Sequence, residues 1–200
     1  KKFDLSLQKF ITGVNDSKVS GREPTITKNN DGTFRYNHTT EALKVANKDL
    51  VTYTIRVYNE GDIDGYAKEV MDDIPAGLKY LPDNNVNKEF EWKMYDKSGK
   101  ETTDVNQATS IKTQYLSKEN EKNGRSNLIE AYNDSKQTPS YRDVRVVFEV
   151  VETALPNKTE RTIINTAEIT DDEDKYGNPI DDKDSTPGNK NTSEDDYSTA

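Results

Sequence analysis

The feature that most constrains the fold is an alternation of apolar and polar side chains, which is clearest over residues 49–59. There Val51, Tyr53, Ile55 and Val57 alternate with threonine and arginine side chains. Successive side chains of a strand point to opposite faces, so this pattern indicates a half-buried antiparallel strand. The same pattern, bounded by turn residues, predicts strands at residues 4–12, 67–75, 90–94, 144–151 and 161–170, with weaker candidates at 32–36, 110–116 and 127–132.

A sustained helical period is missing from the sequence, apart from a polar turn at residues 117–123. Seven or more short strands separated by turns predict an all-β fold, an immunoglobulin-like β-sandwich with long polar loops. We expect this domain to span residues 1–170 and residues 171–200 to form an acidic linker or tail to a following domain. The sequence does not begin with Met, and we expect it to be part of a longer protein.

Composition excludes several classes of function. A net charge of -9 disfavours nucleic acids and anionic membranes as partners, and the lack of cysteine rules out disulfides, thiolate zinc sites and cysteine nucleophiles. No apolar run is long enough to span a bilayer, so direct membrane insertion is not expected. His38, the only histidine, lies in a polar segment, and neither a catalytic triad nor a phosphate-binding loop is evident. We therefore expect no enzyme acting on an external substrate, although a glycosidase-type carboxylate pair stays open among the 37 acidic residues.

Three polar side chains fall where their strands should face the core, namely Lys9, Asp72 and Asn165. Burial lowers the pKa of a lysine and raises the pKa of an aspartate, which leaves a neutral amine beside a protonated carboxyl group. Such an amine is a nucleophile, and the acid can polarise the carboxamide and pass a proton to departing ammonia. The product is an intramolecular Lys-Asn isopeptide bond. The alternative for Lys9 is a position near a sheet edge, with its amine lifted into water.

The residues around these positions carry a resemblance. Lys9 and the runs at 49–55 (DLVTYTI), 59–61 (NEG), 72–78 (DDIPAGL) and 164–169 (INTAEI) resemble the repeated β-sandwich domains of Gram-positive surface proteins and pilins. The chain is similar to the collagen-adhesin type of isopeptide domain over roughly residues 1 to 170.

The resemblance implies that Lys9 and Asn165 are the crosslinked pair and that Asp72 is the assisting acid. A long insertion precedes Asp49, which therefore stays a second candidate for the acid. The resemblance further implies a structural stalk domain of an extracellular, cell-wall-attached protein whose partners are its neighbouring domains. The crosslinking is then a self-directed, single-turnover reaction that requires no cofactor.

A further interpretation of the domain stays open. The domain could itself be an adhesin for a host or matrix component, with an aromatic binding face from Trp92, Tyr95, Tyr115, Tyr132 and Tyr141.

The tail offers oxygen ligands for Ca²⁺, with Asp172, Asp174, Asp182 and Asp184 as the candidates. Its spacing does not match a twelve-residue calcium loop, so a solvated acidic linker is the favoured interpretation.

Overall fold

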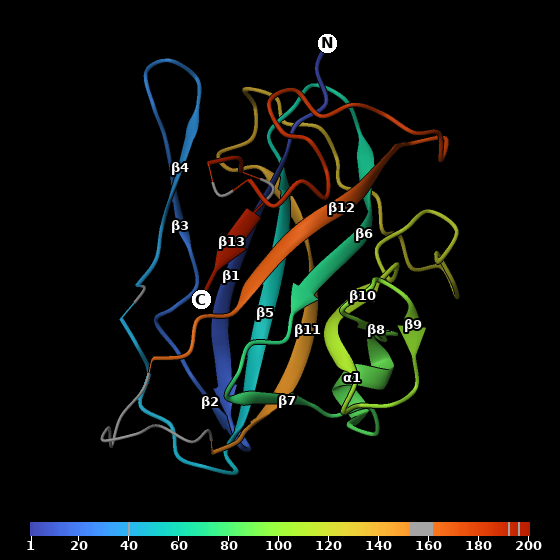
Figure 1. Ribbon diagram of the computed structural model, residues 1–200. Coiled ribbons are helices and arrows are strands. Elements are labelled where there is room, and N and C mark those ends of the chain that lie inside the picture. Colours follow the sequence, from blue (N-terminus) through green and yellow to red (C-terminus); the bar gives the residue numbers. More distant parts are fainter. Residues whose placement is uncertain (40, 153–161, 192, 196) are drawn as a thin grey trace.

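The computed structural model describes residues 1–39, 41–152, 162–191, 193–195 and 197–200. Two antiparallel sheets face each other, with β6 and β12 crossing in front of β1, β5 and β11 in Figure 1. One sheet has the order β2-β1-β5-β11-β7, with bounds Ser17–Lys18, Leu5–Val14, Leu50–Asn59, Ser140–Val150 and Leu78–Tyr80. The other has the order β13-β12-β6-β10-β8-β9, with bounds Tyr197–Thr199, Thr166–Asp174, Gly65–Asp73, Ala108–Thr113, Lys93–Asp96 and Glu101–Thr102. A separate hairpin consists of β3 (Thr25–Lys28) and β4 (Phe34–Asn37), and the one described helix is α1 (Asn85–Glu89).

The core lies between the two sheets, as the alternation of side chains requires. Leu7 and Ile55 from one sheet and Val70, Ile111 and Ile169 from the other are fully buried. Burial of such side chains is the main favourable contribution to folding, at about 1.5–3 kcal/mol each. The predicted all-β sandwich is confirmed. Within the described residues, no helix combines the length and apolar content needed to span a membrane.

The strand predicted at residues 90–94 is wrong in its first half. Asn84 accepts hydrogen bonds from the backbone N–H groups of Val86 and Asn87, and this cap starts the short helix α1. Phe90 ends the helix, and β8 begins only at Lys93. The helix is too short to produce a helical period in the sequence, which is why the alternation was misleading here.

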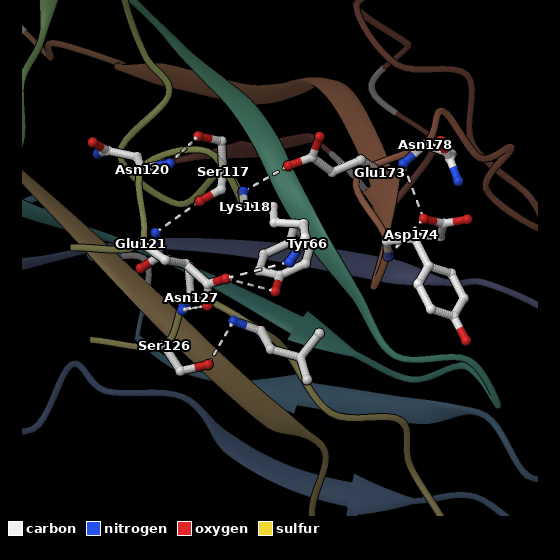
Figure 2. A network of polar contacts seen from close by, with 12 residues as sticks. Tyr66, Ser117, Lys118, Asn120, Glu121, Ser126, Asn127, Glu173, Asp174 and Asn178 are labelled. Carbon is white, nitrogen blue, oxygen red and sulfur yellow. Dashed lines mark hydrogen bonds and ion pairs between the residues drawn. The ribbon is translucent and has the colours of Figure 1, made fainter. Parts of the chain in front are cut away.

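One of the weaker predictions also needs correction, because residues 127–132 form only an isolated bridge between Ile129 and Gly65. Residues 117–123 form turns and bends without a helix. A polar network holds this region to the sandwich (Figure 2). The N–H of Lys118 donates to Glu173 on β12 at 2.6 Å, and the hydroxyl of Tyr66 on β6 donates to Glu121 at 2.9 Å. These contacts stabilise a loop that has little apolar surface of its own.

The end of the chain differs most from the predicted solvated tail. The strand predicted to end at Thr170 continues as β12 to Asp174, and β13 then pairs antiparallel with β12. The start predicted for this strand, Arg161, lies outside the described residues. Backbone pairing explains the return of the tail, because an edge strand such as β12 leaves a row of unpaired N–H and C=O groups that β13 satisfies. Whether another domain follows stays a prediction.

Asn87 provides a test of how α1 is held to the sheet. Its buried side chain donates to the carbonyls of Leu81 and Val147 and accepts from the N–H of Val147. We expect Asn87→Ala to lower the free energy of unfolding in urea by about 1–3 kcal/mol, because these buried backbone groups lose their partners. Asn85→Ala, the same change at an exposed position of the same helix, should cost about 0.5 kcal/mol or less. Equal losses in the two variants would contradict this role.

Candidate functional site

Lys9 lies in the middle of β1 and points between the two sheets. It is opposite Ile55 on β5 and shares the inner face of β1 with Leu5 and Leu7, so its side chain is fully buried. Strand periodicity alone places it there, since the neighbouring positions that face the same way are apolar. The alternative of an amine lifted into water is wrong, because no part of Lys9 is exposed.

Asp72 and Asn165 approach Lys9 from the opposite sheet. Asp72 lies on β6 between Ile111 of β10 and Ala167 of β12. Asn165 precedes Ala167 by two residues, so its side chain is on the same inner face and next to Asp72. Both side chains are fully buried.

One carboxyl group joins the three residues. The Lys9 Nζ atom lies 2.6 Å from Asp72 Oδ1, and Asn165 Nδ2 donates to Asp72 Oδ2 at 3.3 Å. The Asn165 Oδ1 atom is buried without a hydrogen-bond partner in the described part of the chain. A buried amide oxygen without a donor is costly, and this one belongs to the carbonyl that a nucleophile would attack.

Burial shifts the protonation of the pair toward the neutral forms. Desolvation lowers the pKa of Lys9 to about 8, and the attraction of Asp72 opposes this shift only in part. Desolvation likewise raises the pKa of Asp72 to about 6, against the opposing effect of Lys9. Because burial brings the two pKa values closer together, a proton moves from Lys9 to Asp72 at a much lower cost than between the same groups in water, while the ion pair stays the favoured form near neutral pH.

Tyr53 is a contact that the sequence analysis did not assign to the site. Its ring lies 4.6 Å from Lys9 Nζ, two residues along β5 from the position opposite Lys9. The face of an aromatic ring supports an ammonium group and excludes water from it. The sequence does indicate that Tyr53 faces the core, since it alternates with polar side chains in the same way as Val51 and Ile55.

The C-terminal residues also contribute, and no sequence signal indicated them. Ser198 on β13 accepts a hydrogen bond from the backbone N–H of Lys9 at 3.1 Å. Ala200 and Asn165 exchange two backbone hydrogen bonds, each of 2.8 Å. The segment predicted to be a solvated linker thus packs beside the buried triad and fixes the backbone on either side of it.

Asp49, the second candidate for the acid, lies in a different place. It precedes β5, six residues from Ile55, which at strand spacing is roughly 20 Å from Lys9. Its carboxylate accepts from the N–H of Ala46 at 2.8 Å and from the side chain of Asn15 at 3.1 Å, and the bond from Ala46 is the main cause of its lowered pKa. Asp49 therefore organises a turn, and the geometry favours Asp72.

The four predicted calcium ligands separate into two groups. Asp172 and Asp174 are on β12, where Asp172 is buried and Asp174 accepts from the N–H groups of the following turn, including that of Asn178 at 2.9 Å (Figure 2). Asp182 and Asp184 lie in the next loop, near the start of the chain. The structure does not bring the four together.

The aromatic side chains proposed for an adhesive face are also dispersed. Trp92 is in the core and donates to the carbonyl of Arg145. Tyr95 and Tyr115 line a surface pocket of about 450 Å³ on the sheet that contains β8. Tyr132 packs on Phe34 of the β3-β4 hairpin, and Tyr141 packs on Tyr58 of the other sheet. These contacts give each aromatic ring a local packing role and do not unite the five on one surface.

No protein-family model, no curated protein and no solved structure matches this chain significantly.

Proposed function

We propose that this chain is a structural domain of a bacterial surface protein, stabilised by an autocatalytic isopeptide bond between Lys9 and Asn165. The observation that carries the proposal is the fully buried triad in which one carboxyl group contacts both the amine and the carboxamide. An ion pair buried for stability alone is a poor explanation, because the desolvation of both charges offsets most of their attraction. The extracellular, cell-surface setting is supported by the resemblance described above and by the lack of cysteine, since a covalent crosslink replaces disulfides.

The reaction requires only groups of the triad. Proton transfer from Lys9 to Asp72 gives a neutral amine and a carboxylic acid. Rotation of the Asn165 carboxamide by 180° exchanges its nitrogen and oxygen, so that the acid donates to the carbonyl oxygen and polarises the carbonyl carbon. The Lys9 nitrogen attacks that carbon, and Asp72 transfers a proton from the attacking nitrogen to the leaving amide nitrogen.

The step balances without another reactant. A new bond forms between Lys9 Nζ and the side-chain carbonyl carbon of Asn165, the original carbon–nitrogen bond of the amide breaks, and one molecule of ammonia leaves. No electron is transferred, and Asp72 ends as a carboxylic acid that keeps the proton first taken from Lys9. Exclusion of water by the surrounding apolar side chains protects the tetrahedral intermediate from hydrolysis.

Topology explains what the crosslink would contribute. Lys9 is on β1 and Asn165 directly precedes β12, so the bond joins the two facing sheets and encloses most of the chain in one covalent loop. By analogy with disulfides, a loop of this length is worth about 5 kcal/mol of stability. A pulling force that enters near β1 and leaves near β12 would pass through the bond, which suits a stalk module.

The first test is the intact mass of the chain. We expect it to be about 17 Da below the mass calculated from the sequence, which is the loss of one ammonia. Lys9→Ala and Asn165→Ala should each restore the full calculated mass, and digestion should give one branched peptide that contains both residues. An unmodified chain with the full calculated mass would contradict the proposal.

A matched pair of variants tests the choice of acid. We expect Asp72→Asn to abolish the mass loss, because a carboxamide cannot carry the proton between the two nitrogens. Asp49→Asn makes the same chemical change at the turn and should leave the mass loss complete. The mass of each folded variant gives the result, and loss of the crosslink in Asp49→Asn alone would assign the acid to Asp49.

The pKa values predict a pH optimum for the reaction. Chain captured in urea before it has reacted is refolded by dilution at a series of pH values, and ammonia loss is followed by mass. We expect the fastest reaction between about pH 6 and about pH 8. Below this window the pair holds two protons and Lys9 is an ammonium, whereas above it the pair holds none and lacks an acid. A rate that keeps rising well above pH 8 would show that no acid assists.

A further inference from the structure

Four aspartates from both ends of the chain converge on one point at the edge of the sandwich. Asp4 directly precedes β1, Asp182 and Asp184 lie in the loop after β12, and Asp195 precedes β13. One carboxylate oxygen from each lies within 4.8 Å of the others. Only Asp182 and Asp184 were predicted as calcium ligands, because nothing local in the sequence connects the loop with residues so distant along the chain.

Asp4 has a buried carboxylate oxygen without a hydrogen-bond donor in the described part of the chain, which points to a ligand. Asp4 is only 5% exposed, and this oxygen is its Oδ1 atom. Its other oxygen accepts from Lys183 Nζ at 3.3 Å, and Lys183 is the one cation paired with the cluster among the described ion pairs. A buried carboxylate oxygen without a donor is costly, and one lysine does not balance four carboxylates.

The cluster is held in place by hydrogen bonds to its carboxylates, including one from the N–H of Asp184 to Asp182 Oδ1 at 3.3 Å, and a carboxylate oxygen that accepts one such bond still has a lone pair for a cation. The N–H of Leu5 donates to Asp182 Oδ2 at 2.7 Å, and the hydroxyl of Ser185 donates to Asp195 Oδ1 at 2.8 Å. Two backbone bonds dock the same segments, from the N–H of Lys183 to the carbonyl of Phe3 and from the N–H of Leu7 to the carbonyl of Asp195. The carboxylates are thus positioned before any ion arrives, which lowers the entropic cost of binding.

We propose that Asp4, Asp182, Asp184 and Asp195 bind one Ca²⁺ ion, which fastens the loop after β12 and the start of β13 to the start of β1. Calcium takes six to eight oxygen ligands at about 2.3–2.6 Å, so oxygens on opposite sides of the ion are about 5 Å apart. The spacing of the four oxygens fits this sphere, with water completing it. Magnesium fits less well, since it requires near-ideal octahedral geometry and retains most of its water. None of the four aspartates belongs to the Lys9 triad, so calcium binding at this site does not require the crosslink.

Calorimetric titration of the full chain, stripped with a chelator and dialysed, tests the site with CaCl₂ as the only ligand. We expect saturable binding of one equivalent of calcium. Asp184→Asn should weaken it by about tenfold or more. Asp181→Asn removes the same charge from an exposed neighbour outside the cluster and should leave the affinity nearly unchanged.

Asp184 is exposed, so its replacement should not impair folding, and circular dichroism of both variants checks this. Absence of saturable binding would overturn the proposal. Equal affinities of the two variants would also overturn it, because they would indicate diffuse attraction to the acidic surface. A parallel titration with MgCl₂ that gave the same affinity as calcium would overturn the assignment of the metal.

Discussion

The contact between Lys9 and Asp72 is the constraint on which the structure of the core depends. Two ionisable groups that would each be costly to bury alone meet at 2.6 Å between the sheets, with Asn165 completing the set. Any register shift of β1 or β6 by one residue would turn one of these side chains to the outer face and leave the other unpaired. The polar triad therefore specifies how the two sheets are aligned, and this role does not depend on whether the bond forms.

The long alternating strands and the triad could be predicted from the sequence for the same reason. Strand periodicity is local, so the inner faces of β1, β5 and β6 can be read directly, and a lysine in that phase is conspicuous. The separation of Asp49 from Lys9 needed the structure, because Asp49 and Asp72 both lie where their strands alternate toward the core, and only the tertiary geometry places Asp49 far from Lys9 and Asp72 beside it.

Other parts could not be predicted because their causes are not local. The helix α1 depends on the cap from Asn84 and on Asn87 reaching β11, neither of which produces a period in the sequence. The strand β13 is polar and short, and it forms because β12 offers an edge. The aspartate cluster combines residues from opposite ends of the chain, so its composition is a product of the fold.

The place of β13 also has a consequence for the order of events during synthesis. Asp195 and Ser198 bond to β1 and Ala200 bonds to Asn165, on either side of the triad, yet these residues are made after every other part of the sandwich. A ribosome therefore releases β1, which carries Lys9, long before it releases β13, which completes the surroundings of Lys9. If the proposed crosslink requires this dry environment to neutralise Lys9, its formation waits for these last residues, and a partly made domain is not locked into a wrong arrangement.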